Sequence, residues 1–538
     1  MLLPYYQKQS KYNRVSQPLL VTRVLVLTAI FILTPICVVL RPLPSSSPSA
    51  AHYSTQDFAD DSPALQEPMS GPTQTQRPID PTELAARLDA QLAVDALFAR
   101  QSTTLVQAIS RYELRTNRHP PPHYERWFQY AQDNKCLIDE YDQIHRDFEP
   151  FYELAERDPG YFRRMIERAK SELAADSSGI CVIDIHDGIA SASGYCPTSY
   201  VDAWPITFDK FSRILPDTTF LISSRDEPRV VFNTRDPAAL ESALGNATDN
   251  SPFHISPRPT TAEFFDKQSG CQVPISGHGF MRSVNAEHSF LLSTYQPGYT
   301  TDLYPLLSMA KATPCFSDIL FPAEYYYDRS WWSGKFGYPD IITPWEEKQP
   351  KLYWRGSSTG GKIVGSNYHN FTRFKLAKLA SAHPTLMDVA ITNFEKHLCD
   401  EAVCDGARVI EEYNITGKGE PRENVYEFKY AMDVDGMSFS GRFLGLLKSG
   451  SLVFKATIFT EYFSPWLRPF EHYIPVKPDL SDLVQRIEWA NANPVEARRI
   501  QQRGLAAAKR VLRDEQNDCY FAAVLFEWAR LTSFKLSL

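Results

Sequence analysis

The sequence lacks an excess of positive charge, an internal repeat and any cysteine pair spaced for zinc. Its 538 residues carry 56 Lys and Arg against 64 Asp and Glu, which gives a formal net charge of −8. This balance excludes a basic nucleic-acid-binding protein, and over such a length it provides no long-range field that would attract a partner. The nine cysteines include no C-x-x-C pair, so zinc is not indicated. The chain is also far too long to be a small domain held together by disulfides.

What the composition does provide is ordinary globular protein. Hydrophobic residues make up 43% and charged residues 22% of the chain, which is enough to bury one or two cores of about 100–200 residues each. Function therefore has to be sought in particular segments.

One apolar run, residues 24–40, carries no formal charge and lies at the short end of the roughly 17–25 residues that span a bilayer. Four basic residues precede it and one follows directly, so the positive-inside rule places residues 1–23 in the cytosol. A cleaved signal peptide is the alternative. We favour a signal anchor because the run exceeds the roughly 7–15 residues of a usual signal-peptide core. We expect a single-pass type II protein of the Golgi or endoplasmic reticulum membrane, with the bulk of the chain in the lumen.

Cysteines and sequons agree with that compartment. Eight cysteines remain outside the apolar run, an even number that predicts four disulfides in an oxidising lumen. They are Cys136, Cys181, Cys196, Cys271, Cys315, Cys399, Cys404 and Cys519. Cys399 and Cys404 are close enough for a local loop, and the other pairings stay open. Three Asn-x-Thr triplets predict N-glycosylation at Asn246, Asn370 and Asn414.

The next segment, residues 41–80, is rich in Pro and Ser and cannot bury enough apolar surface to fold, which predicts a disordered stem. A capping Asp, Pro81 and Glu83 then combine the signals of a helix start. Leu84, Leu88 and Leu92 follow at helical spacing, so we expect an amphipathic helix with these leucines as its apolar stripe.

Beyond this point, strand-like and helical patterns alternate, which favours an α/β architecture in two domains. Strands are expected at residues 180–185, with a hairpin turn at Asp187-Gly188, and at 219–223, 351–354 and 451–454. Helices are expected at residues 439–448, 482–492, 494–511 and 520–531.

A glycine-rich turn follows the strand expected at residues 351–354. Backbone N–H groups in such a turn, with Arg355 beside them, suit a phosphate or another anion. Gly356, Gly361 and Lys362 satisfy the spacing of a P-loop, but Ile363 stands where a magnesium-binding hydroxyl is required. A P-loop is therefore disfavoured, and a plain glycine-rich connection is the other alternative.

The segment from Tyr430 to Arg442 could contribute to diphosphate binding in two ways. Asp433 and Asp435 could hold Mg²⁺ or Mn²⁺ bridging a diphosphate. Alternatively, the start of the helix expected at residues 439–448 receives the diphosphate around Ser440, with Arg442 adding charge. Two aspartates beside a Gly-Met-Ser turn are more often turn residues than metal ligands, so we favour the second idea.

A carboxylate stands just after the strand expected at residues 219–223. In α/β folds a catalytic base often lies there, and Asp226 could take a proton from a substrate hydroxyl. Glu227 is an equally placed competitor, and Asp-Glu-Pro also reads as the opening of a turn. Aromatic residues are a separate signal: they are dense from the triplet Tyr325 to Tyr327 on to Trp354, which suits either a glycan cleft or core packing.

These stretches together resemble the fungal capsule-associated glycosyltransferase family, which is related to the Rumi-type protein O-glucosyltransferases. The resemblance runs from about Arg118 to the C-terminus. The matching motifs are Leu215-Pro-Asp with Asp226-Glu-Pro, Tyr353-Trp-Arg-Gly-Ser, Lys429-Tyr…Asp-Gly…Ser-x-Arg442, Gly450-Ser-Leu-Val-Phe and His472-Tyr-Ile-Pro-Val. Any one of them is weak, and their common order makes the resemblance specific. This sequence departs from the family at Ser223, where relatives commonly have Asn. The positions of Asp433 and Asp435 are not occupied by acidic residues throughout the family.

The resemblance implies a GT-B-like fold, with two Rossmann-like domains facing a cleft, and inverting transfer from a UDP-sugar, xylose or glucose being favoured. It implies Asp226 as the catalytic base and donor binding by Arg355, Gly356, Ser357, Ser440 and Arg442. No resident metal is assigned, although Mn²⁺ or Mg²⁺ is left open. The acceptor is a hydroxyl of a glycan or a protein.

The sequence predicts an order of segments and domains along the chain. It comprises a tail (1–23), an anchor (24–40), a stem (41–80), a helical lead-in (81–175), an acceptor-side domain (176–345) and a donor-binding domain (346–538). The rival functions are an inactive lectin-like or scaffold protein of the same fold, and a glycoside hydrolase, which needs two carboxylates flanking one bond.

Overall fold

The computed structural model describes residues 81–173, 179–196, 204, 206–248, 255–256, 299–313, 316–329, 343–399 and 401–533. The predicted tail, anchor and stem, together with Cys271 and Cys315, lie outside the described residues. Within the described part of the chain, no helix has the length and hydropathy needed to cross a membrane.

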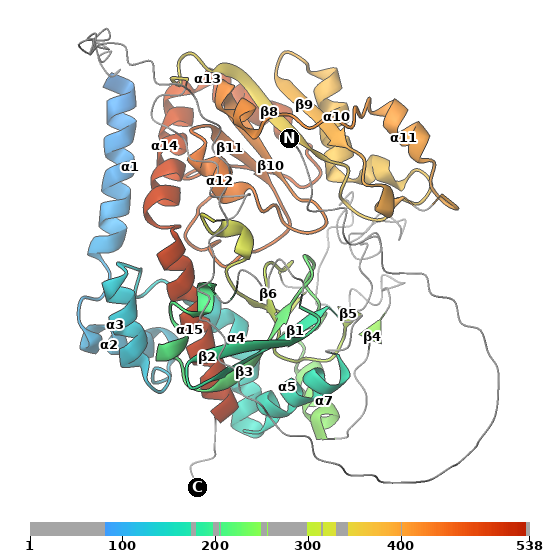
Figure 1. Ribbon diagram of the computed structural model, residues 1–538. Coiled ribbons are helices and arrows are strands. Elements are labelled where there is room, and N and C mark those ends of the chain that lie inside the picture. Colours follow the sequence, from blue (N-terminus) through green and yellow to red (C-terminus); the bar gives the residue numbers. More distant parts are fainter. Residues whose placement is uncertain are drawn as a thin grey trace, which may run out of the picture. The chain divides into compact units, whose positions relative to one another are not determined.

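A set of helices opens the described chain. They are α1 (Pro81–Ala99), α2 (Leu105–Thr116), α3 (Tyr124–Asp133), α4 (Asp142–Arg157) and α5 (Tyr161–Glu172). In Figure 1, α1 runs alongside α14 (Pro494–Arg510), against which it packs.

The buried face of α1 differs from the one expected. The three leucines of the predicted stripe are exposed, Leu84 at 46%, Leu88 at 55% and Leu92 at 68%. The buried face consists of the smaller Ala86, Ala90 and Val94. Small residues allow two helices to approach closely, and ion pairs from Glu83 to Arg498 and from Asp89 to Arg503 hold this face against α14.

The first sheet has the strand order β2-β1-β3-β6-β7. Its strands are β1 (Ile180–His186), β2 (Ile189–Gly194), β3 (Thr218–Ser223), β6 (Leu307–Ser308) and β7 (Ile319–Leu320). Asp187 and Gly188 form the predicted hairpin turn with φ of 50° and 75°. A two-residue turn returns the chain antiparallel, so β1 and β2 are antiparallel. The strand β1 is also antiparallel to β3 on its other side, while β3, β6 and β7 are parallel to one another. The expectation of a Rossmann-like parallel sheet is therefore met only by these last three strands.

Two smaller elements accompany this sheet. The helix α7 (Pro237–Thr248) follows β3 in the chain, and β4 (Ile255–Ser256) pairs antiparallel with β5 (Tyr299–Thr300).

The second sheet is fully parallel, with the order β12-β11-β10-β8-β9. Its strands are β8 (Gln349–Ser357), β9 (Met387–Asn393), β10 (Phe428–Val434), β11 (Leu452–Ala456) and β12 (Ile474–Val476). Between and after them come α10 (Thr372–Ala382), α11 (Gly406–Glu412), α12 (Phe443–Lys448) and α13 (Leu483–Ala492). This order is that of a doubly wound Rossmann-like fold. One sheet precedes residue 345 and the other follows it, while the domain boundaries themselves stay predictions.

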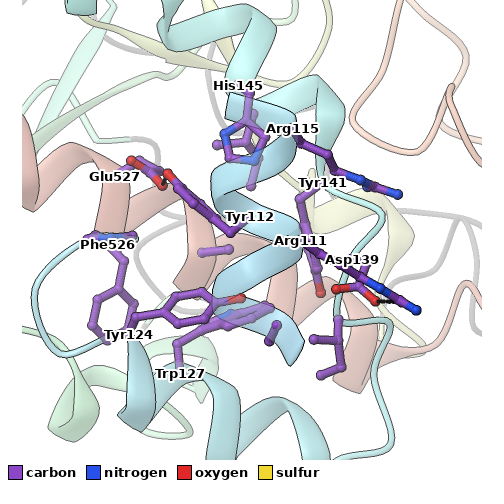
Figure 2. Close-up of a pocket in the computed structure, with 15 residues that line it drawn as sticks. Arg111, Tyr112, Arg115, Tyr124, Trp127, Asp139, Tyr141, His145, Phe526 and Glu527 are labelled. Carbon is purple, nitrogen blue, oxygen red and sulfur yellow. Dashed lines mark hydrogen bonds and ion pairs between the residues drawn. The ribbon is translucent and has the colours of Figure 1, made fainter. Parts of the chain in front are cut away.

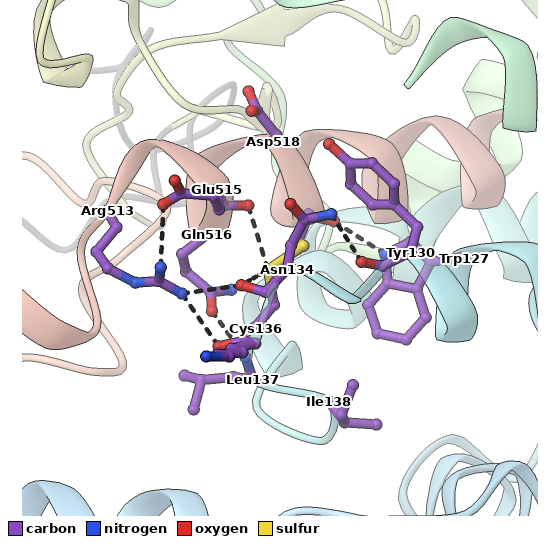
Figure 3. Close-up of a disulfide and its surroundings, with 12 residues drawn as sticks. Trp127, Tyr130, Asn134, Cys136, Leu137, Ile138, Arg513, Glu515, Gln516 and Asp518 are labelled. Carbon is purple, nitrogen blue, oxygen red and sulfur yellow. Dashed lines mark hydrogen bonds and ion pairs between the residues drawn. A yellow bond between two sulfur atoms is a disulfide. The ribbon is translucent and has the colours of Figure 1, made fainter. Parts of the chain in front are cut away.

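The last helix, α15 (Asp514–Ser533), leaves the second sheet and packs on β3, α3, α4 and α5. Its Trp528 indole donates to the carbonyl of Thr219 at 2.8 Å. Cys136 and Cys519 form a disulfide between the lead-in and α15, with Arg513 bonding the same lead-in turn (Figure 3). Three of the four predicted disulfides lie in the described chain. The other two are Cys181–Cys196 and the predicted local loop Cys399–Cys404.

Candidate active site

The carboxyl ends of β8 and β10 mark the point where the strand order of the parallel sheet reverses. The loops after these two strands lead to opposite faces of the sheet, and in open α/β sheets ligands bind in the crevice between such loops. The predicted donor residues Arg355, Gly356 and Ser357 end β8, and Ser440 and Arg442 lie in the loop after β10. The topology therefore brings the predicted donor residues to one edge of the sheet.

Two arginines converge there on one indole ring. The guanidinium carbons of Arg442 and Arg373 lie 5.8 Å and 5.4 Å from the ring centroid of Trp354. Arg373, in the first turn of α10, donates to the carbonyls of Ser357 and Asp435, both at 3.0 Å. Gly356 is required beside them, since a Cβ there would stand 2.5 Å from the Trp354 ring and 3.2 Å from Arg442 Nη2.

The electrostatics of this pair suit an anion. Burial lowers the pKa of both guanidinium groups, and repulsion by Arg442 helps bring the pKa of Arg373 to about 9. Arg442 donates to the carbonyl of Arg355, as Arg373 does to its two carbonyls. These bonds to carbonyl oxygens fix the orientation of the guanidinium groups, while the nearby carboxylate of Asp433 raises the pKa of both arginines by less than burial lowers it. A diphosphate would offset the repulsion between them.

The side chain of Arg355 is placed differently from the expectation. Its Nε is 2.7 Å from Glu420 Oε1 and its Nη2 is 2.6 Å from Asp388 Oδ1. Asp388 lies on the neighbouring strand β9, opposite Tyr353 and therefore diagonal to Arg355. Arg355 thus brings its main-chain carbonyl to the arginine pair, while its charge is engaged by two carboxylates.

The helix expected from residue 439 begins only at Phe443 and is six residues long. Residues 436–441 form a turn ahead of it, in which Gly436 N–H donates to the carbonyl of Ser438 at 2.8 Å. Gly and Ser are poor residues for a helix interior, which explains the late start. Ser440 therefore does not open a helix, and the expected dipole contribution at that residue is wrong.

The predicted base lies against this same turn. Asp226 follows β3, and its carbonyl accepts a 2.5 Å hydrogen bond from the Ser438 hydroxyl. The Tyr325 hydroxyl donates to Asp226 Oδ1 at 3.3 Å. Burial raises the pKa of the Asp226 carboxyl, and the Tyr325 bond lowers it by less. Its competitor Glu227 is only 2% exposed, whereas Asp226 is partly exposed. Of the two carboxylates, Asp226 is therefore the more accessible, and its role as a base stays a prediction.

Asp433 and Asp435 belong to the buried base of the site. Asp433 Oδ2 is 2.9 Å from Lys455 Nζ, and Asp435 Oδ2 accepts from Ile458 N–H at 2.9 Å. Burial raises the pKa of Asp435 to about 7. Among the described residues, the group with three potential metal ligands within 4.8 Å of one another is instead the exposed set His186, Asp187 and Asp217 beside the β1–β2 turn.

Main-chain hydrogen bonds close the glycine-rich turn, and no α-helix begins directly after it in this described part of the chain. Ile363 N–H donates to the Leu398 carbonyl at 2.8 Å, and Gly365 N–H to that of Val403 at 2.6 Å. A P-loop leads directly into a helix, whereas here α10 starts only at Thr372. The structure thus agrees with the rejection of a P-loop.

The predicted sequons differ in exposure. Asn414 is exposed with φ of 50°, and Asn370 is half-buried at the end of a 3₁₀ turn. Asn246 falls in α7, where its side chain lies outside the described part. Glycosylation at all three positions stays a prediction.

A separate pocket lies between α2, α3, α4 and α15 (Figure 2). Its volume is about 40 Å³, which at about 10–15 Å³ each admits a few water molecules. Arg111 pairs with Asp139 at 2.6 Å, and the Tyr112 hydroxyl bonds Glu527. None of the predicted site residues lines it, so it is not the donor site.

Two residues of the site escape the sequence analysis, Arg373 and Tyr325. Arg373 follows the sequon at Asn370, where a helical pattern resumes after the glycine-rich turn. The basic residue at the start of this helical pattern is the signal from which the sequence could have indicated an anion-binding side chain. Tyr325 stands in a tyrosine triplet that predicts aromatic density without a role for its hydroxyl groups.

Comparison with known proteins finds similarity over the part of the chain that holds the second sheet. Residues 339–538 match Glycosyl transferase family 90. The chain is 32% identical over 188 residues to protein O-glucosyltransferase 2 of Danio rerio, covering 35% of this chain and 34% of the relative. It is 29% identical over 186 residues to protein O-glucosyltransferase 3 of Rattus norvegicus, covering 34% and 33%.

A longer match includes part of the first sheet's half of the chain. Protein O-glucosyltransferase 1 of Rattus norvegicus is 27% identical over 263 residues, 45% of this chain and 61% of the relative. The chain spans about a third of the length of the type 2 and type 3 relatives that it matches. The narrower resemblance to the fungal capsule-associated branch stays a prediction.

Proposed function

We propose that this protein is an inverting glycosyltransferase of the secretory pathway that moves a sugar from a UDP-sugar to a hydroxyl of a protein or glycan. The observation that carries the proposal is the convergence of Arg373 and Arg442 on Trp354 at the switch point, with Asp226 bonded to the same loop through Ser438. The names of the relatives favour glucose as the sugar and protein as the acceptor, and xylose stays the alternative donor.

The proposed reaction is a single displacement. Asp226 takes the proton of the acceptor hydroxyl while that oxygen forms its bond to the anomeric carbon, and the bond from that carbon to the diphosphate oxygen breaks. A carboxylate whose pKa is raised by burial is a better base than an exposed one. Arg373 and Arg442 stabilise the negative charge that develops on the departing diphosphate.

The other predicted donor residues contribute the space that a missing side chain leaves and main-chain carbonyls that orient the arginines. Gly356 keeps the space that Arg442 occupies, and Ser357 and Arg355 supply the carbonyls that orient the two guanidinium groups. Ser440 lies in the turn between Asp226 and Arg442 and is proposed to contact the donor.

The alternative function, an inactive lectin-like or scaffold protein, predicts glycan binding without a nucleotide. The discriminating experiment is a screen of UDP- and GDP-sugars, with and without Mn²⁺, that follows both sugar release and thermal unfolding. A donor that binds the folded state raises the melting temperature. We expect stabilisation by UDP and turnover of one UDP-sugar; glycan binding with neither effect would favour the alternative.

A further inference from the structure

Three consecutive tyrosines after β7 donate hydrogen bonds to three different carboxylates. Tyr325 bonds Asp226 Oδ1 at 3.3 Å, Tyr326 bonds Glu461, and Tyr327 bonds Asp518 Oδ1 at 3.0 Å. The first two tyrosines belong to the 3₁₀ turn Glu324–Tyr326. Successive side chains of such a turn point in different directions. One short segment therefore contacts the loop after β3, the loop after β11 and α15.

The bond of Tyr326 leads into the parallel sheet. Glu461 is completely buried, and burial raises its pKa well above the ordinary value. Its second oxygen lies 3.3 Å from Lys455 Nζ, which is also 2.9 Å from Asp433 Oδ2. Lys455 lies in β11 and Asp433 in β10. A continuous polar chain thus connects Tyr326 to two central strands of the donor sheet.

The same hydroxyl also reaches the donor loop itself. Tyr326 OH is 3.5 Å from the carbonyl of Ser440. Its ring is packed against Phe439 and Phe463 at centroid distances of 5.9 Å and 5.2 Å. The ring fills space in the core, whereas the hydroxyl makes the specific connection between the two sheets' loops.

We propose that Tyr325 and Tyr326 are positioning residues of the transfer reaction, which hold the Asp226 carboxylate in register with the donor loop. Tyr325 bonds the carboxylate directly, and Tyr326 fastens the same turn to the donor sheet through Glu461. This inference rests on the proposed role of Asp226 as the base. A base must lie within hydrogen-bonding distance of the proton it takes, and a misplacement of about 1 Å costs about 10²-fold in rate.

Tyr327 supplies the matched control. It is as buried as Tyr326, and its partner Asp518 pairs with Lys210 at 2.8 Å, outside the donor sheet. A Tyr→Phe change at each position removes one hydroxyl and leaves the ring. A purely structural role predicts similar effects of Tyr326→Phe and Tyr327→Phe on turnover once stability is taken into account.

The experiment uses the full chain and measures kcat, UDP affinity by calorimetry and the melting temperature. Tyr326→Phe is expected to lower kcat at least tenfold with UDP affinity within twofold, while Tyr327→Phe keeps kcat within twofold. Tyr325→Phe removes a bond that lowers the pKa of Asp226, so the acid limb of kcat/KM should move to higher pH. Equal kcat in the Tyr326→Phe and Tyr327→Phe variants, or an unmoved acid limb, would overturn the inference.

Glu461 provides a second pair of variants should Tyr326→Phe fold poorly. Glu461→Gln keeps an oxygen that accepts from Tyr326 and should retain most of the turnover, whereas Glu461→Ala should lose it; the reverse order counts against the inference. Failure of the proposed function is distinguishable, because then the wild-type chain itself transfers no sugar from any donor.

Discussion

The two sheets differ in how their topology exposes chemistry. In the parallel sheet, the order reverses between β8 and β10, so chain connectivity itself provides a ligand site at the carboxyl ends. In the mixed sheet, β1 runs against its neighbours, and the catalytic candidate comes from an irregular loop after β3. A parallel doubly wound sheet thus fixes the place of a ligand, whereas the mixed sheet contributes one carboxylate that must be held by bonds from elsewhere.

The buried charges follow the same division. Asp433, Asp435 and Lys455 are buried at the carboxyl ends of the parallel strands, and the two aspartates are near enough to Arg373 to raise its pKa. In the proposed mechanism, the parallel sheet binds the nucleotide and the mixed sheet supplies the group that takes the proton. Variants that separate binding from chemistry therefore test the comparison directly.

The largest effect is expected from Asp226→Asn. Removal of a general base costs about 10²–10⁴-fold in rate, while the amide keeps the size of the side chain and its contact with Tyr325. Sugar transfer should fall by at least 10²-fold and UDP affinity, measured by calorimetry, should stay within twofold. Glu227→Gln is the matched control with nearly normal transfer. A large loss of UDP binding in Asp226→Asn would break the assignment of chemistry to the mixed sheet.

The next effect concerns the arginines. Charge-assisted hydrogen bonds are worth about 1.5–3 kcal/mol each, so Arg373→Ala and Arg442→Ala should each weaken UDP binding at least tenfold. Arg355→Ala removes a guanidinium already paired with Glu420 and Asp388 and should weaken it much less. Calorimetry on the three variants ranks them. A larger loss in Arg355→Ala than in Arg373→Ala would restore the expectation drawn from the sequence.

This arginine comparison also shows what the sequence could reveal. A strand pattern followed by glycines predicted the end of β8 and the turn after it, because local patterns report strands and turns, and the donor role of that edge stays a proposal. Which guanidinium group is engaged by a neighbouring carboxylate depends on the register between β8 and β9, which places Asp388 opposite Tyr353 and within ion-pair distance of Arg355, and no local pattern carries that register. The pairing of Cys136 with Cys519, 383 residues apart, was open for the same reason.

Side-chain periodicity likewise predicted the type of a secondary-structure element but not the element against which it packs. The helix starting at Pro81 was predicted, yet its leucine face was assigned to the wrong side because the close packing with α14 selects alanines. Polar bonds between distant loops, such as those from Ser438 and Tyr325 to Asp226, leave no periodic signal at all.

A third, smaller effect concerns pH. The pKa of Asp435 is raised to about 7 in the folded chain from an ordinary value of 3.8, so the folded state binds more protons than the unfolded one between these values. The free energy of unfolding should therefore decrease as pH rises from about 4 to about 7 through this group, and Asp435→Asn should flatten that slope. An ionised Asp435 also offsets the charge of Arg373, so UDP affinity should decrease as pH rises through 7. Denaturant titrations and calorimetry from pH 5 to pH 8 measure both, and equal slopes in wild type and variant would contradict the role of Asp435.

The smallest effect concerns α1, which joins the lead-in to the donor half through α14. Leu88 is 55% exposed and Ala90 is 2% exposed, so substitution should change the free energy of unfolding little at Leu88 and much more at Ala90. Leu88→Ser should change the free energy of unfolding by about 0.5 kcal/mol or less. Ala90→Leu overpacks the contact with α14 and should cost about 1–3 kcal/mol. Urea unfolding of both variants measures the difference. A cost at Leu88 as large as that at Ala90 would mean that the leucine face is covered in solution, and that the lead-in is bound on two sides rather than to the donor half alone.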